Sequence, residues 1–264
     1  GMCHKKAAGA QGKEGLAVVY IDMAQKDSKL ISTSLDRLVK AGLSLIANHP
    51  PTRLGYPFKT TPLSEICWKM EGTTSKLLRK MSKLSTLERL QLLQRETLVW
   101  SGRYKLDDQV STRKPGFYLA RGIVLRSPRD FLHLMWDNDR TNEYNNHSMG
   151  RESILTLEDE ILKGQASYAT KVIRSETRVP FTGLSVQVNC LMHVRQLEAP
   201  DQGFVVVSRS LDQGPAGLHL HGCERDGSIK TGKNEILWGV NIIRAVPNHP
   251  HQTDLTSLSQ VGSS

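Results

Sequence analysis

Residues 117–145 read FYLARGIVLRSPRDFLHLMWDNDRTNEYN, and their pattern changes from that of a strand to that of a helix. Residues 117–125 are rich in apolar and aromatic side chains and predict a strand. Ser127 is a good helix cap and Pro128 suits the first helical position, so a helix is expected to start there. Three apolar residues share one side of this helix: Phe131, Leu134 and Met135.

Short apolar or alternating runs follow, separated by turn signals such as Asp201-Gln202-Gly203. Runs of this length, with glycine and aspartate between them, are typical of an antiparallel meander. The expected strands are 153–158, 167–175, 186–195, 203–210, 216–222, 235–245 and 254–260.

The chain before residue 117 shows a helical pattern. Apolar residues at three- and four-residue steps predict a helix over 16–47, and Pro50 and Pro51 end it because proline cannot continue a helix. A capping box at Ser85 and Glu88 predicts another helix after it. The further helical stretches are 63–84, interrupted near Gly72, and 86–100.

The order of these elements is helices, one strand, one helix, then many strands. This order predicts an α+β fold with helices gathered on an antiparallel sheet. Such a sheet curves by its natural twist, and a curved sheet with a helix across it encloses a space suited to a small molecule.

Five pieces of the sequence, in the right order, resemble START (StAR-related lipid transfer) domains. They are the strand and helix of 120–145 with its Trp136-Asp137 run, the stretch 170–181 ending in Pro180-Phe181, the strand 204–211 with its Val-Val-x-Ser-Arg-Ser pattern, 239–243, and 253–261. The resemblance covers residues 85–264 and leaves 1–84 as a basic, helical N-terminal extension.

The resemblance implies a helix-grip fold, in which a curved antiparallel sheet surrounds a hydrophobic tunnel for one lipid. It implies binding, transfer or sensing of a sterol, phospholipid or sphingolipid, with no catalysis and no cofactor. Family members continue after the last strand into a helix that covers the tunnel, and the sequence given stops at Ser264 without one. Either the natural chain continues further, or it is short, or another segment covers the tunnel. The N-terminal helices are candidates for its place.

The tunnel candidates include four residues of one expected strand, Gln187, Asn189, Leu191 and His193, which alternation puts on one face. That face either lines the tunnel or meets solvent. Several family members carry a charged residue near this point, where this chain has Val186 and Gln187, so the ligand contact is expected to be apolar or neutral. The full set of tunnel candidates is Trp136, Tyr144, Gln187, Asn189, Leu191, His193, Val206 and Trp238.

The net charge of +9 is concentrated in residues 1–110, where 18 Lys/Arg and 10 Asp/Glu give +8, against +1 for 111–264. The expected helix over 74–84 has basic residues on its polar side, so it either lies on an anionic membrane or packs on the sheet. Its membrane-surface candidates are Lys76, Arg79, Lys80 and Lys83. No apolar run approaches the length of a membrane span, and the four scattered cysteines are typical of free thiols. We expect a cytoplasmic protein with a lipid partner and no nucleic-acid partner, peripheral at membranes if this helix binds them.

One alternative is a membrane- or partner-binding module that acts through the basic N-terminal helices, and the other is an enzyme of the cyclase or hydrolase type on the same scaffold. The enzyme would need His193, Asn189 and Glu176 to converge in the cavity. The chain has no G-x-S-x-G elbow, no P-loop and no G-x-G-x-x-G. His219 and His221 could share one face of a strand with Cys223, but no fourth ligand is near in sequence, so no metal is expected.

Overall fold

A computed structural model describes residues 20–22, 28–47, 66–73, 97–106, 109–110, 116–158, 161, 164, 167–178, 185–198, 203–210, 219–221 and 234–263. Its elements are β1 (Tyr20–Asp22), α1 (Ser28–Ala47), β2 (Ile66–Thr73), β3 (Leu98–Leu106), β4 (Gln109–Val110), β5 (Phe117–Val124), α3 (Pro128–Trp136), the 3-10 helix η2 (Thr141–Glu143), β6 (Ser148–Glu158), β7 (Tyr168–Arg178), β8 (Ser185–Leu197), β9 (Gly203–Ser210), β10 (His219–His221), β11 (Asn234–Val246) and β12 (His249–Ser263).

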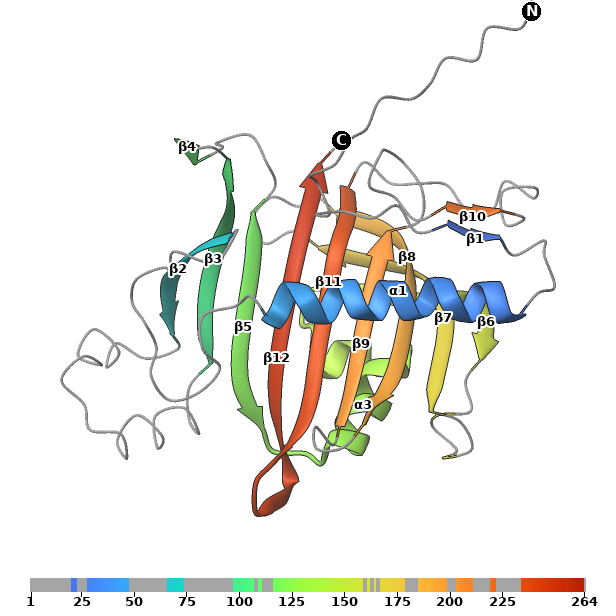
Figure 1. The fold of residues 1–264 in the computed structure, drawn as a ribbon. Coiled ribbons are helices and arrows are strands. Elements are labelled where there is room, and N and C mark those ends of the chain that lie inside the picture. The colour runs from blue at the N-terminus through green and yellow to red at the C-terminus, as the bar shows by residue number, and fades with distance from the viewer. Residues whose placement is uncertain are drawn as a thin grey trace, which may run out of the picture.

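The fold is α+β, as predicted, and its main body is one curved antiparallel sheet (Figure 1). The strand order is β2-β3-β5-β12-β11-β9-β8-β7-β6, and β4 pairs with β3 at the side. From β6 to β9 and from β11 to β12 the strands form the predicted meander, but β10, within the expected strand 216–222, instead pairs in parallel with β1 in a separate two-stranded sheet. The last strand, β12, returns to pair with β5, so the two halves of the chain meet in the middle of the sheet.

The helix after β5 starts as the sequence predicts. Ser127 is its N-cap, and the Ser127 hydroxyl accepts a hydrogen bond from the Asp130 backbone N–H at 3.1 Å. Pro128 occupies the first turn, where its missing N–H costs no hydrogen bond. The helix ends at Trp136, with Asp137 as its C-cap.

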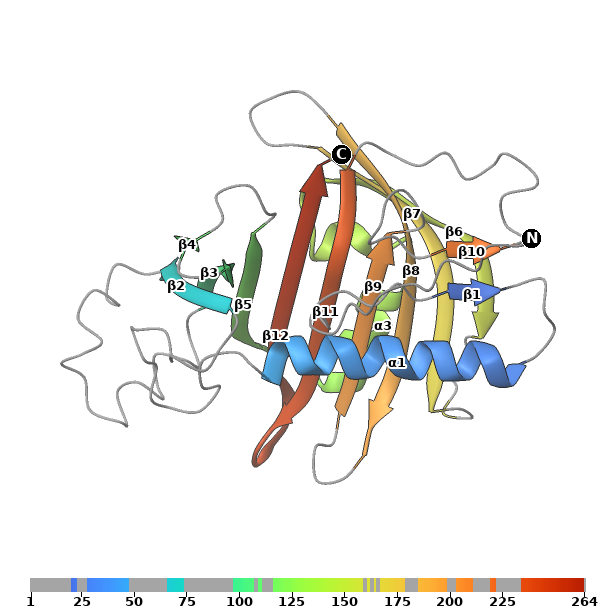
Figure 2. The same cartoon turned by 45° about the horizontal axis from the view of Figure 1, so that its top comes forward.

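The two long helices lie on opposite faces of the sheet (Figures 1 and 2). Helix α1 lies against β9 and β11, where a Cβ added at Gly42 would meet a methyl group of Val240 at 3.2 Å and one of Val207 at 3.3 Å. Helix α3 packs against the neighbouring residues Val206 and Ile243. Because successive residues of a strand point to opposite faces, these contacts assign one face to each helix. We call them the α1-side face and the α3-side face.

Three predicted helical stretches are partly wrong. Residues 66–73 form strand β2, and the helix expected over 86–100 cannot include Leu98–Trp100, which begin β3. Residues 20–22 form β1, so the first helix starts at Ser28 instead of residue 16. Residues 66–73 form a strand instead of the expected helix because they pair with β3 in an antiparallel ladder. Local helix propensity is a weak preference that such pairing overrides.

Part of the predicted N-terminal extension therefore completes the sheet, since β2 precedes residue 85 and pairs with β3. Helix α1 covers the α1-side face, opposite to α3. The division of the chain into 1–84 and 85–264 stays a prediction.

Candidate functional site

The α3-side face is apolar where α3 covers it. Phe131, Leu132, Leu134 and Trp136 of the helix are buried against side chains of β7, β8, β9 and β11. The sheet residues of this core are Ala169, Ile173, Cys190, Met192, Val194, Val206 and Ile243. Burial of each large side chain contributes about 1.5–3 kcal/mol, so this core fixes α3 on the sheet.

The same face changes in polarity along β12 and its neighbours. One row across the ladders holds Leu255, Ile243 and Phe204, of which Leu255 and Phe204 are partly exposed apolar residues. The next row is mixed and holds Ala120, Ser257, Asn241 and Val206, of which Val206 belongs to the α3 core. Rows on one face are two residues apart, about 6.8 Å along the strands.

The third row is polar across five strands. Ser101 of β3 faces Tyr118 of β5, which faces Ser259 of β12. The row continues through Gly239 of β11 to Ser208 of β9. Tyr118 is 56% exposed, and the three serines are partly exposed. We call Ser101, Tyr118, Ser259 and Ser208 the hydroxyl row.

The α1-side face of the same strands has the opposite character. The residues that alternate with the hydroxyl row are almost all apolar, and each is less than 4% exposed. They are Trp100, Phe117, Leu119, Leu258, Val240 and Val207. The α1-side face is therefore closed and apolar at these six positions, although it also holds the buried polar residues Arg209 and Gln260, whereas the face beside α3 changes from apolar to polar and stays partly accessible.

Two cations from the sheet hold the C-terminal end of α3, whose last carbonyls lack partners within the helix. Arg151 of β6 donates through Nη2 to the carbonyls of Met135 at 2.6 Å and Asp137 at 2.7 Å. Lys171 of β7 donates through Nζ to the carbonyl of Trp136, and its ammonium lies 4.6 Å from the centre of the Trp136 ring. These contacts fix the helix end to two strands.

Asn138 joins the two cations. Its Oδ1 accepts from Arg151 Nε at 3.0 Å and from Lys171 Nζ at 2.9 Å, while its Nδ2 donates to Ser153 Oγ at 2.9 Å. Burial, with the nearby Arg151 charge as a smaller cause, lowers the pKa of Lys171 to about 7. Lys171 and Arg151 therefore act as a structural clamp on α3.

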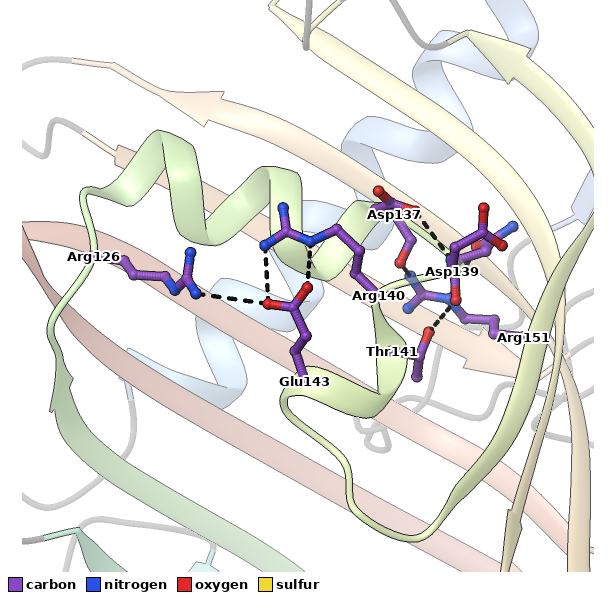
Figure 3. Close-up of polar contacts among 8 residues, drawn as sticks. Arg126, Asp137, Asp139, Arg140, Thr141, Glu143 and Arg151 are labelled. Atoms are coloured by element: carbon purple, nitrogen blue, oxygen red, sulfur yellow. Dashed lines mark hydrogen bonds and ion pairs between the residues drawn. The ribbon is translucent and has the colours of Figure 1, made fainter.

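A second polar cluster follows the helix (Figure 3). Arg140 binds Glu143 through two hydrogen bonds, at 2.6 and 2.9 Å, and Arg126 lies 3.6 Å from the same carboxylate. The hydrogen bond from Arg140 is the main cause that lowers the pKa of Glu143. Asp137 Oδ1 accepts from the backbone N–H of Asp139 at 3.0 Å. Asp137 and Asp139 therefore share a hydrogen bond at the helix end, while Arg140 forms a separate ion pair with Glu143.

The predicted tunnel residues lie on both faces. Trp136 and Val206 belong to the α3-side core. Tyr144 is 40% exposed, and its hydroxyl accepts from Arg151 Nη1 at 2.8 Å. Trp238 is in β11, but its side chain lies outside the described residues, as do Lys76, Arg79, Lys80 and Lys83.

The four β8 candidates share one face, as alternation predicts, and it is the α1-side face. Asn189, Leu191 and His193 are buried there, whereas Gln187 is exposed. Gln187 lines an open pocket of about 290 Å³ over β6 and β7, together with Arg174, Glu176 and Glu152. The structure does not bring these residues together with Trp136 and Val206.

His193 is buried beneath α1. Its Nδ1 lies 2.8 Å from Thr170 Oγ1, and its Nε2 has no hydrogen-bond partner among the described residues. Burial lowers the pKa of His193 to about 3, so the ring is neutral at physiological pH. In the adjacent ladder Arg209 is also buried, and this burial lowers its pKa to about 10.

The sequence analysis did not select the hydroxyl row. Its signal is present in the alternation of residues 256–260, Thr-Ser-Leu-Ser-Gln, in which the two serines flank a leucine. The alternation shows that Ser257 and Ser259 share a face, but the neighbours that complete the row come from register across five strands.

Among the side chains that the structure describes, no group of three His, Cys, Asp or Glu could hold a metal ion. His219 and His221 lie in β10, which pairs with β1 so that His221 faces Asp22 in register. Cys223 lies outside the described residues. No helix in the described ranges is long and apolar enough to cross a bilayer.

Solved structures of START domains are similar to this fold. The human StarD13 (DLC2) lipid transfer and protein localization domain is 12% identical, with 72% of this chain and 84% of that chain covered and a TM-score of 0.45. Human StAR-related lipid transfer protein 5 is 11% identical, with 88% and 84% covered and a TM-score of 0.48. A STAR-related lipid transfer protein from Xanthomonas axonopodis is 10% identical, with 63% and 76% covered and a TM-score of 0.36.

No protein-family model matches the sequence, and no curated protein is significantly similar to it. At these identities the likeness concerns the fold, so a function has to be argued from the side chains of this chain.

Proposed function

We propose, from a START-like, helix-grip fold, that this protein binds one lipid on the α3-side face of its sheet. Transfer of that lipid between membranes, or sensing of it, in the cytoplasm is part of the proposal. The site would extend from the edge of the α3 core toward the hydroxyl row and would form one wall of a tunnel.

The observation that carries the proposal is the polarity gradient on this face. Leu255 and Phe204 offer partly exposed apolar surface at one end, next to the α3 core. The hydroxyl row lies two rows away, about 13 Å along the strands. An amphipathic molecule lying along the strands would meet apolar groups with its tail and hydroxyl groups with its head.

Apolar burial would supply most of the affinity, at about 25 cal/mol for each Å² removed from water. The hydroxyl groups would orient the ligand, because an uncharged polar group costs less to bury than a charge and is satisfied by one or two hydrogen bonds. This division of roles is usual in small-molecule sites.

The enzyme alternative gains no support from the residues on which it depends. Asn189 and His193 lie on the α1-side face, away from the proposed site, and both are buried. Glu176 is on that face too, in the open pocket beside Gln187. With its pKa lowered to about 3, His193 would also be a weak general base at neutral pH.

The test is uptake of lipid by the delipidated protein, measured by native mass spectrometry after incubation with vesicles containing sterol, phospholipid and sphingolipid. We expect one lipid per chain. Ala120→Trp would place a large ring on the α3-side face beside Ser257 and should abolish uptake without unfolding the protein. Thr156→Trp, at an exposed position of β6, is the matched control and should bind normally. Failure of the native chain to take up any of these lipids would refute the proposal.

A further inference from the structure

The β11–β12 hairpin and the turn after β5 form one end of the sheet, and β12 stops at the opposite end (Figures 1 and 2). Val124 of β5 pairs with Thr253 at the base of the hairpin, and Thr253 Oγ1 donates to the carbonyl of Arg126 at 2.8 Å. The turn after β5 is therefore fixed beside the hairpin. We call Leu125, Arg126 and the hairpin residues 247–251 the tip.

Leu125 carries the most exposed large hydrophobic side chain among the described residues. It is 80% exposed, against 56% for Tyr118, which comes next. The hairpin residues of the tip are exposed too, and Pro247 and Pro250 are among them. A single exposed leucine is ordinary on a protein surface, so its neighbours decide which partner could cover it.

The neighbours of Leu125 are cationic. Arg126 is 45% exposed, and the carboxylate of Glu143, 3.6 Å away, is already held by two hydrogen bonds from Arg140. Residues 121–130 and 244–254 together hold four arginines and two aspartates, a net charge of +2. Glu198, just after β8, lies four strand spacings from β5, about 19 Å, which exceeds the screening length of about 8 Å at physiological salt.

The tip is continuous with the apolar end of the proposed lipid site. Val124 and Leu255, next to the tip on the α3-side face, are partly exposed apolar residues at the edge of the α3 core. Tyr118 of the hydroxyl row is seven residues back along β5 from Leu125, about 24 Å. A lipid that left a membrane at the tip with its headgroup first would bring that headgroup to the hydroxyl row and its tail onto the apolar residues.

We propose that the tip docks on an anionic phospholipid membrane, with Leu125 among the acyl chains and Arg126 at the phosphate groups. Apolar burial and attraction to anionic lipids together set the strength of such contacts. One leucine and a charge of +2 give weak, reversible docking, which suits a protein that leaves the membrane with its lipid. The inference rests on the proposed function and names the partner from which the site is loaded.

Flotation of the full-length protein with vesicles of mixed phosphatidylcholine and phosphatidylserine tests the docking surface. Leu125→Glu puts a charge where the apolar contact is proposed and should weaken binding about tenfold or more. Arg126→Glu reverses one charge and should weaken it about five- to thirtyfold. Vesicles of phosphatidylcholine alone should bind the native protein about tenfold more weakly or less still.

The matched controls change similar residues away from the tip. Met149→Glu alters another exposed hydrophobic residue, on the edge strand β6, six strand spacings from β5. Arg178→Glu reverses an exposed charge at the end of β7. Both should bind the anionic vesicles within about twofold of the native protein, because charges this far from the contact are screened. Circular dichroism of each variant confirms that its fold is intact.

Insertion at the tip is distinguished from general attraction of a chain with net charge +9 by its depth in the membrane. Brominated phosphatidylcholine in the anionic vesicles quenches tryptophan that enters the acyl-chain region. Leu125→Trp should be quenched beyond the background from the four native tryptophans. Met149→Trp should show that background only.

The outcomes separate this inference from the proposed function. Native flotation by both Leu125→Glu and Arg126→Glu, or background quenching of Leu125→Trp, would overturn the docking surface. Cholesterol, phosphatidylcholine or ceramide delivered from cyclodextrin, with no membrane present, tests lipid binding by itself, and Leu125→Glu should keep this uptake. A native protein that docks through Leu125 but takes up no lipid would refute the proposed function and leave the docking surface standing.

Discussion

His193 Nδ1 lies 2.8 Å from Thr170 Oγ1 across the β7–β8 ladder, and neither side chain reaches solvent. The imidazole is neutral in the folded chain because burial lowers its pKa to about 3. The unfolded chain binds this proton near the ordinary value of 6.5. Between these two values the unfolded state holds more protons, so stability falls as the pH falls.

We therefore expect the native protein to lose stability, on the order of a few kcal/mol, between about pH 6.5 and pH 4. Urea titrations at pH 7, 5.5 and 4 measure this loss. His193→Gln cannot titrate, so its unfolding free energy should depend less on pH over this range. His249→Gln, on the exposed β11–β12 turn, should keep the native dependence. Parallel curves for native protein and His193→Gln would contradict the prediction.

The buried Lys171 is expected to make the stability of the folded protein depend on pH above pH 7. Burial lowers its pKa to about 7, against an ordinary value of 10.5. Below about pH 7 the folded state carries the buried ammonium, and the cost of burying it is fully present. As the pH rises toward 10.5 the folded state releases the proton while the unfolded state keeps it, so stability increases.

Thermal unfolding at pH 7 and pH 9.5 compares the native protein with Lys171→Met. The native midpoint should rise relative to that of the variant over this interval, since methionine does not titrate. Burial raises the pKa of the Cys190 thiol to about 12, and the pH dependence that this causes is the same in both proteins, so it cancels in the comparison. A variant whose midpoint changes with pH just as the native one does would show that Lys171 titrates normally.

Arg151 makes four hydrogen bonds that a lysine cannot reproduce. Its guanidinium reaches the carbonyls of Met135 and Asp137, the amide oxygen of Asn138 and the hydroxyl of Tyr144. Lysine has the same charge but a compact head with no fork of donors. We expect Arg151→Lys to lower the unfolding free energy by about 2–3 kcal/mol, because helix carbonyls lose their partners.

Guanidinium chloride titration measures this loss. Arg178→Lys, at the exposed end of β7, is the matched control and should change stability by less than about 0.5 kcal/mol. If both substitutions cost the same, Arg151 is not a clamp on α3.

The features that depend on residues close together in the chain were predicted correctly from the sequence. Ser127 and Pro128 mark the start of α3 because capping depends on residues within one turn. The β8 alternation placed Asn189 and His193 on one face because that depends only on period 2. The α+β class follows from the same local signals.

Properties that depend on tertiary pairing were not predicted. The alternation of side chains along a strand predicts that Asn189 and His193 share a face, but it does not predict which helix lies on that face. The position of α1 is given by the contact of Gly42 with Val207 and Val240, which comes from tertiary packing. Of the hydroxyl row the sequence shows only that Ser259 shares a face with Ser257 of the next row, because the other members of the hydroxyl row come from strands far apart in sequence. Strand β2 was missed because its ladder with β3 overrides its helical pattern.

Two glycines with positive φ show whether the sheet requires glycine because of a close contact or because of backbone conformation alone. Gly203 begins β9 at φ +153°, and a Cβ placed there would lie 2.1 Å from the carbonyl oxygen of Ile243 in the adjacent strand. Gly150 in β6 has φ +138°, but a Cβ there would meet no atom within 4 Å. Gly203→Ala should cost more than about 3 kcal/mol, since a backbone atom of a central strand must move. Gly150→Ala should cost only the conformational strain, about 1–2 kcal/mol. Urea titration of the two variants gives the difference directly, and equal losses would show that contact with Ile243 is not what requires glycine at position 203.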